Sequence, residues 1–116
     1  MIATWYNQKY QDNENLLKWL AVKYNLQMVC VTKGKDGAVM YQEGKIYSHP
    51  GFVVRTVDTV GAGDAFLAGL VASFLKGEKP EEMLALACAT GAFVASRNGA
   101  TPKYNMNEIE RIMNSS

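Results

Sequence analysis

The sequence has 116 residues, of which 48% are hydrophobic and 20% are charged, and its formal net charge is +1. This composition predicts one modest globular core and excludes an intrinsically disordered chain, and the interspersed charges give no electrostatic basis for binding nucleic acid or an anionic membrane. The sequence contains neither the apolar core of a signal peptide in its first residues nor an apolar run near the roughly 20 residues that span a bilayer.

The first part of the chain predicts a helix, a buried strand and a hairpin. Residues 1–11 show no clear period, so we expect an irregular segment there. Apolar residues at helical spacing predict a capped amphipathic helix over 12–25. The nearly continuous apolar run 27–32 is typical of a strand covered on both faces, as in a parallel sheet. Turn signals then predict short antiparallel strands over 38–41 and 46–47.

The second part predicts a strand followed by three helices. The apolar segment 52–57 is expected to form a strand that leads into a glycine turn. Helices are predicted over 65–76, where Gly77 is a good stop signal, and from Pro80 to about Asn98. The many small residues of the second of these helices indicate close packing against a neighbour. A last helix is expected over 107–113.

The cysteines and the histidine offer little chemistry. Cys30 and Cys88 are far apart and lack metal-ligand spacing, so we expect two reduced, buried thiols in a cytoplasmic protein. His49 is the single histidine and lies in a loop-like stretch, which argues against a histidine-based triad or a multi-histidine metal site.

The most informative stretch is the glycine turn Gly61-Ala62-Gly63, with Asp58 before it and Asp64 after it. The first N–H groups of a helix have no intrahelical partner and lie at the positive end of its dipole, so such a turn can hold a phosphate. The alternative is a tight turn in which Asp64 only caps or complements the helix start. No lysine follows as in a P-loop, and the spacing is not the dinucleotide fingerprint.

Three segments together resemble one known family. Residues 58–66 (DTVGAGDAF) resemble the second signature of the PfkB/ribokinase family of carbohydrate and nucleoside kinases. Residues 31–38 (VTKGKDGA) resemble its upstream nucleotide-site segment, and 97–102 (RNGATP) resemble its C-terminal loop. The order and spacing are those of the family, and the matches cover nearly the whole chain from about residue 12 onward.

The resemblance implies a fold and a domain organisation. The expected fold is the C-terminal part of a ribokinase-like, Rossmann-like three-layer α/β fold with a mainly parallel sheet. The expected unit is a single partial domain over 1–116. In the family, the sugar-binding part, the lid strands, the first glycine-rich signature and a magnesium-placing Asn-x-x-Glu segment lie N-terminal to this region.

The resemblance also implies an activity, because family members transfer the γ-phosphoryl group of ATP to a hydroxyl, usually that of a sugar. The N–H groups of Gly61, Ala62 and Gly63 would then form the anion hole. Asp64 matches the catalytic base, which orients the acceptor hydroxyl and takes its proton.

Further positions match the nucleotide and cation sites of the family. Thr32, Gly34 and Gly37 would line the nucleotide, although a strand end and a hairpin turn would need the same residues. Asp58 and the Val60 carbonyl match positions that help to bind a monovalent cation in many relatives. The expected cofactors are therefore ATP and Mg²⁺, with K⁺ as a further candidate.

Two positions in the C-terminal part of the chain support the resemblance less strongly. Gly99 belongs to the same neighbourhood but also reads as a helix stop. Cys88 departs from the family, since many of its sugar kinases have asparagine there, near the nucleotide base.

The leading hypothesis is a fructokinase-like sugar kinase, with nucleotide and sugar as partners. The alternatives are a kinase for ribose or a nucleoside, and a non-catalytic nucleotide-binding or interaction fragment. Half of a doubly wound sheet leaves an edge strand and apolar faces uncovered. We therefore expect the isolated chain to self-associate or form a homodimer, and to phosphorylate little or no sugar.

Overall fold

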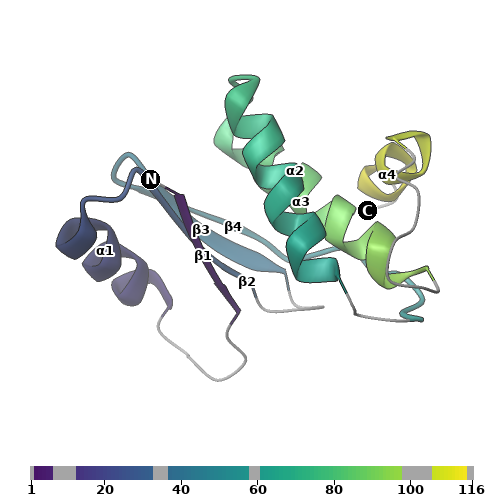
Figure 1. The fold of residues 1–116 in the computed structure, drawn as a ribbon, viewed down its shortest axis with the longest axis horizontal. Helices are drawn as coiled ribbons and strands as arrows, with labels where there is room; N and C mark the ends of the chain where they lie inside the picture. Colours follow the sequence, from purple (N-terminus) through teal and green to yellow (C-terminus); the bar gives the residue numbers. More distant parts are fainter. Residues whose placement is uncertain (1, 7–12, 33–36, 58–60, 98–105, 115–116) are drawn as a thin grey trace.

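The computed structural model describes residues 2–6, 13–32, 37–57, 61–97 and 106–114. In chain order the described elements are β1 (Ile2–Tyr6), α1 (Asn13–Tyr24), β2 (Met28–Thr32), β3 (Ala38–Gln42), β4 (Lys45–His49), α2 (Ala62–Leu75), α3 (Pro80–Ala95) and α4 (Met106–Met113). Figure 1 shows the sheet between α1 on one side and α2 with α3 on the other.

The sheet has the strand order β1-β2-β3-β4. β1 pairs with β2 in parallel, whereas the β2–β3 and β3–β4 pairings are antiparallel. The β3–β4 hairpin turns through Glu43 and Gly44, whose φ angles are 51° and 81°. Positive φ at both central residues is the mark of a two-residue type I′ turn. Within the described sheet, the parallel part of the predicted fold is the β1–β2 pair.

β2 is buried on both faces, as its apolar run predicted. Val29 and Val31 pack in one cluster with Leu17 and Ala21 of α1. Met28 and Cys30, at the alternate positions, belong to a larger cluster with α2 and α3 on the other face. The three layers of the expected α/β fold are therefore α1, the sheet and the α2–α3 pair.

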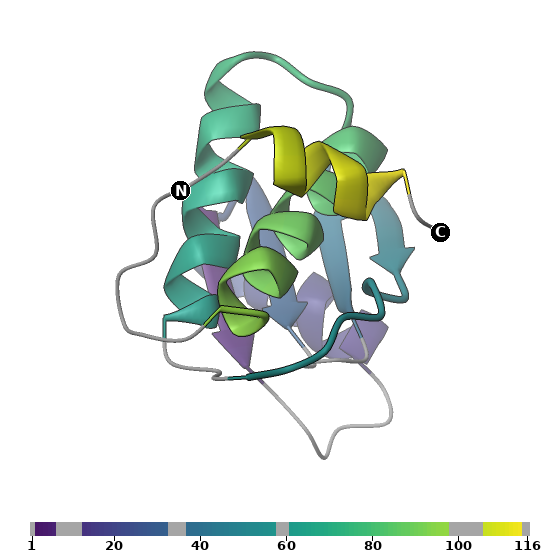
Figure 2. The same ribbon diagram turned by 90° about the vertical axis from the view of Figure 1, so that its right-hand side faces the viewer.

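The α2–α3 pair packs closely because glycines lie at the contact. A Cβ atom at Gly69 of α2 would lie 2.9 Å from Oγ1 of Thr90 on α3. A Cβ atom at Gly91 of α3 would lie 3.2 Å from the carbonyl oxygen of Ala62. The close packing predicted from the small residues of α3 is confirmed. Figure 2 shows α4 across the outer side of α3, where Ile109 is 1% exposed.

Two predicted elements are wrong. Residues 2–6, expected to be irregular, form β1 and pair along their length with β2. Residues 52–57, expected to be a strand, lie in no strand. One backbone hydrogen bond ties the end of this segment to α3, from the N–H of Val57 to the carbonyl of Ala95 at 2.8 Å.

Element boundaries differ by a few residues. α2 begins at Ala62 rather than at residue 65, so Gly63 lies inside the helix. α3 ends at Ala95, before the expected stop near residue 98. Asn25, expected to end the first helix, has a left-handed φ of 52° just after α1. None of the helices in the described ranges is long and apolar enough to cross a membrane.

Candidate active site

Among the described residues, the first turn of α2 has no side-chain cap. Gly61 is the N-cap residue with a φ of 81°, in the left-handed region where glycine is at no disadvantage. Its carbonyl accepts the hydrogen bond of the Ala65 N–H at 2.9 Å, and no side chain of the described residues caps the turn. The N–H groups at the start of an α-helix have no intrahelical acceptor. They therefore form a donor surface at the positive end of the α2 dipole.

Gly63 and Asp64 border this donor surface and are exposed. A Cβ atom built on Gly63 would meet no heavy atom within 4 Å, so the space above its backbone is free. Asp64 lies in the first turn and makes no capping hydrogen bond. Asp64 therefore does not act as a hydrogen-bonding cap. The remaining part of that alternative is a favourable interaction of its negative charge with the helix dipole.

Gly37 and Thr32, predicted to line the nucleotide, lie at the carboxyl end of β2 and the start of β3. Thr32 ends β2 and pairs with Ala38, the residue after Gly37. Gly37 has a φ of 94°, and a Cβ atom there would overlap the carbonyl oxygen of His49. Glycine is thus required at position 37, both by the backbone angle and by the packing against the end of β4. Gly34 lies outside the described residues.

The fold brings the first turn of α2 and the predicted nucleotide-side residues Thr32 and Gly37 to the same end of the molecule. In Figures 1 and 2 the first turn of α2 lies at the lower end, where β1 and β2 also end. The register pairs Tyr6 with Thr32, so both strands end together. Ligands of open α/β sheets bind outside the carboxyl ends of parallel strands. Asp58, Val60 and Gly99 also lie outside the described residues, so their predicted roles stay predictions.

His49 ends β4 beside Gly37, in a position that sequence reasoning treated only as a loop. Its Nδ1 accepts a hydrogen bond from the Gly51 N–H at 2.9 Å, so the neutral ring carries its proton on Nε2. Its ring lies 4.7 Å from that of Phe52, centroid to centroid. Burial lowers the pKa of His49 below its ordinary value of 6.5.

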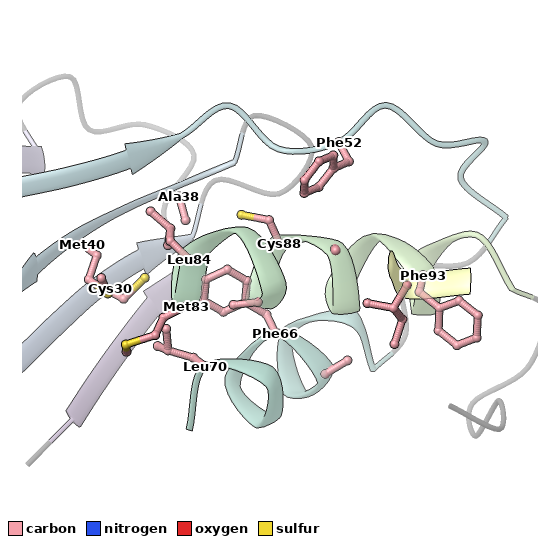
Figure 3. Close-up of a cluster of buried hydrophobic side chains, with 14 of the residues drawn as sticks. Cys30, Ala38, Met40, Phe52, Phe66, Leu70, Met83, Leu84, Cys88 and Phe93 are labelled. Carbon is pink, nitrogen blue, oxygen red and sulfur yellow. The ribbon is translucent and has the colours of Figure 1, made fainter. Parts of the chain in front are cut away.

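The two thiols are buried and free, as predicted. Cys88 lies on α3 in the same core cluster as Ala38 and Phe52 (Figure 3). Burial raises the pKa of Cys88 to about 12. Burial also raises the pKa of Cys30 to about 12, with a smaller contribution from Cys88. Both groups are therefore protonated thiols at neutral pH.

An interaction that the sequence did not predict joins α3 to α4. Arg97 follows α3 and forms an ion pair with Glu108 of α4. Its guanidinium carbon also lies 5.0 Å from the centroid of the Phe93 ring. Arg97 and Glu108 are 11 positions apart, and no local spacing rule connects them. In the described part of the chain, no group of three or more His, Cys, Asp or Glu side chains is placed to hold a metal ion.

Comparisons with known proteins agree with this arrangement. The family model described as pfkB family carbohydrate kinase matches residues 2–106. The chain is 34% identical over 102 residues to 2-dehydro-3-deoxygalactonokinase of Haloferax volcanii, covering 88% of the chain and 32% of that protein. It is 41% identical over 87 residues to the ATP-dependent ribose-1-phosphate kinase of Halopiger xanaduensis, covering 75% and 29%. It is 37% identical over 95 residues to a fructokinase of Escherichia coli, covering 77% and 31%.

The fold also matches solved kinases. The crystal structure of phosphofructokinase-2 from Escherichia coli in complex with potassium superimposes with a TM-score of 0.86 at 16% identity. That match covers 97% of this chain and 40% of the other. The ribokinase-like fold is therefore confirmed. The chain spans about a third of the length of the curated relatives it matches.

Proposed function

The chain belongs to the pfkB family of carbohydrate kinases, and from this premise we propose that it supplies the phosphate-binding turn and catalytic carboxylate of an ATP-dependent sugar kinase. The observation that carries the proposal is the open first turn of α2. There an exposed glycine backbone and an exposed carboxylate lie side by side at the positive end of the helix. The match to the family model spans this turn and the nucleotide-side residues.

The glycine turn acts as the anion hole in this proposal. Phosphoryl transfer spreads negative charge over the transferred oxygens, so fixed donors stabilise the transition state more than the ground state. The N–H groups of Gly61, Ala62 and Gly63 are held by the helix and need no rearrangement to donate. The free space above Gly63 allows a phosphate oxygen to approach the backbone.

Asp64 acts as the base. The acceptor hydroxyl oxygen bonds to the γ-phosphorus of ATP while the bond from that phosphorus to the β,γ-bridging oxygen breaks and ADP leaves. The hydroxyl proton passes to the Asp64 carboxylate. Because that carboxylate makes no capping hydrogen bond, its oxygens are available to orient the hydroxyl.

The nucleotide lies along Thr32 and Gly37, together with Gly34 of the same family segment. Both described residues lie at the end of the sheet where α2 begins, and this position supports a nucleotide bound between β2 and the proposed anion hole. Cys88 replaces the asparagine of many family members. Since it is a buried, protonated thiol, it cannot supply the amide contact to the base.

Cations complete the proposed site. Mg²⁺ would accompany ATP and neutralise charge on its phosphates. Asp58 and the Val60 carbonyl would hold a monovalent cation, for which oxygen ligands are suitable, and potassium is present in the solved phosphofructokinase-2 structure. The residues for this cation lie outside the described ranges, so no step of the mechanism depends on them.

The acceptor is a sugar hydroxyl, and fructose is the first substrate to test. The matched relatives act on a deoxy sugar acid, ribose 1-phosphate and fructose at similar identities. Ribose or a nucleoside is the second choice. Because the chain spans about a third of these relatives, we propose that it binds nucleotide but needs further elements to bind a sugar. We also propose that the chain self-associates and that it is located in the cytoplasm.

Calorimetry on the 116-residue chain tests the proposal. ATP and ADP should bind with Mg²⁺ present, Asp64→Asn should bind ATP at least as tightly as the wild type, and Gly63→Val should lose at least tenfold in affinity. Glu110→Gln, an exposed change on α4, is the matched control and should bind normally. A coupled assay with fructose and ribose follows, and any turnover found should disappear in Asp64→Asn. Wild-type protein that takes up no ATP, or a Gly63→Val variant that binds as well as wild type, contradicts the proposal.

A further inference from the structure

The segment that follows β4 is the surface against which Gly37 packs. A Cβ atom built on Gly37 would overlap the carbonyl oxygen of His49. It would also lie 2.6 Å from the carbonyl carbon of Pro50 and 2.7 Å from the backbone nitrogen of Gly51. Only glycine allows two backbones to approach this closely. The position of Gly37 is therefore set by the conformation of residues 49–51.

One side chain holds residues 49–51 in that conformation. Nδ1 of His49 accepts a hydrogen bond from the Gly51 N–H at 2.9 Å, which closes a turn within the segment. Gly51 has a φ of 83°, in the left-handed region where glycine meets no steric penalty. Asparagine and aspartate form the same kind of turn when a side-chain oxygen bonds to the N–H two residues on. The imidazole of His49 supplies the acceptor that such a side chain would supply.

The ring of His49 is itself packed against the core. It lies 4.7 Å from the Phe52 ring, centroid to centroid, with 44° between the ring planes. Phe52 is 8% exposed and belongs to the same core cluster as Ala38 (Figure 3). In the β3–β4 register His49 pairs with Ala38, the residue after Gly37. The contact with Phe52 therefore favours the ring orientation in which Nδ1 faces the Gly51 N–H.

We propose that His49 is a positioning residue for nucleotide binding, which acts through Gly51 and Gly37 and not by contact with the nucleotide. This inference rests on the proposed function, in which ATP lies along Gly37. Without the Nδ1 acceptor, the Gly51 N–H loses its partner and residues 49–51 take up other conformations. Gly37 then loses the surface that fixes it, and the backbone that binds ATP is no longer preorganised. The affinity for ATP falls as a result, while the core stays folded.

Two substitutions at position 49 test the proposal on the 116-residue chain. His49→Asn supplies an oxygen that accepts the Gly51 N–H, so it should bind ATP within about twofold of wild type. His49→Leu keeps an apolar side chain against Phe52 but has no acceptor, and its affinity should fall about fivefold or more. Ser48→Ala, at the exposed preceding residue of β4, is the matched control and should bind as wild type does. Calorimetric titration with ATP and Mg²⁺ gives each affinity.

Amide hydrogen exchange reports whether the turn itself has changed. The Gly51 amide should be protected in wild type and in His49→Asn, and it should exchange faster in His49→Leu. The amides of α3 should stay protected in all variants, which shows that the core is folded. If His49→Leu does not fold, His49→Thr and His49→Val repeat the comparison, because these side chains are similar in shape and only threonine has an acceptor.

The outcomes separate this inference from the proposed function. Equal ATP affinities of the folded His49→Asn and His49→Leu variants would overturn the positioning role and leave the proposed function standing. Loss of affinity in His49→Asn, with its Gly51 amide still protected, would indicate direct contact of His49 with the nucleotide and would also overturn it. Wild-type protein that binds no ATP contradicts the proposed function, and the inference then fails with it.

Discussion

Replacing Gly63 by alanine should separate the stability of α2 from its proposed ability to bind phosphate. A Cβ atom at this position meets no heavy atom within 4 Å, so the methyl group causes no clash in the free protein. Alanine also loses less backbone entropy than glycine when a helix forms. We expect Gly63→Ala to raise the free energy of unfolding by about 0.5–1 kcal/mol.

The same methyl group should weaken nucleotide binding. If the phosphates of ATP approach the Gly63 N–H at the usual hydrogen-bonding distance of about 2.9 Å, the methyl group occupies space next to them. A tenfold loss of affinity corresponds to about 1.4 kcal/mol, and we expect at least that loss. Urea unfolding gives the first quantity and calorimetric titration with ATP and Mg²⁺ gives the second.

Gly69 provides the opposite case on the same helix. A Cβ atom at Gly69 would lie 2.9 Å from Oγ1 of Thr90, so Gly69→Ala should destabilise the fold by about 1–3 kcal/mol. The folded fraction of that variant should still bind ATP normally. If Gly63→Ala instead binds ATP as tightly as wild type, the phosphate does not approach this turn and the assignment of the anion hole is wrong.

The remaining predictions concern residues around the site. Gly37→Ala should lower the free energy of unfolding by roughly 3 kcal/mol or more, because it combines an unfavourable φ with overlap of a backbone carbonyl; a urea midpoint equal to that of wild type would contradict the packing described here. Burial lowers the pKa of His49, so its contribution to stability is present above pH 6.5 and is lost as the pH falls through the lowered pKa; the ring-proton shift of this single histidine reports that pKa, and His49→Gln should flatten this part of the stability curve. Burial raises the pKa of Cys30 and Cys88 to about 12, so their contribution is present below the ordinary thiol value of 9.0 and is lost as the pH rises toward 12; at pH 8 a disulfide reagent should modify neither thiol faster than the chain unfolds. The proposed self-association follows from the exposed edge of the sheet and from exposed apolar side chains such as Val53, and a concentration-independent monomer in a sizing experiment would exclude it.

Much of the fold could be predicted because the local patterns are strong. The continuous apolar run of β2 requires burial on both faces, and α1 and the α2–α3 pair supply it. The turn residues at Glu43 and Gly44 predicted the β3–β4 hairpin, and the small residues of α3 predicted its close contact with α2. In each case the pattern that predicts the element lies within the element itself.

The predictions that were wrong depend on distant partners. β1 is a short strand without a clear period, and its pairing with β2 crosses more than 20 residues of sequence. The valine-rich segment 52–57 favours an extended backbone, but a strand also needs a partner strand. Within the described residues this segment pairs with no strand, and the N–H of Val57 bonds instead to the carbonyl of Ala95 in α3. The ion pair of Arg97 with Glu108 likewise depends on how α4 packs against α3.

The start of α2 shows why the candidate site could be predicted in part. Glycine disfavours a helix interior, so residues 61–63 suggested a turn before the helix. Gly61 does take a turn conformation, but Gly63 lies within the first helical turn. The N–H donors at the start of α2 could therefore be predicted from the glycine motif. Their exposure depends on how the surrounding chain folds, which the motif does not determine.

The contact of Gly91 with Ala62 has a consequence for how the proposed activity would change during evolution. The carbonyl oxygen of Ala62 lies 3.2 Å from where a Cβ atom of residue 91 would be, which is tight by only a few tenths of an ångström. A slightly larger residue at 91 would displace the start of α2 without unfolding the protein. Reaction rates are sensitive to such displacements, since about 1 Å of misplacement can cost roughly a hundredfold. A substitution at Gly91 of α3 would thus tune the rate of the proposed phosphoryl transfer while every residue of the glycine motif stays the same.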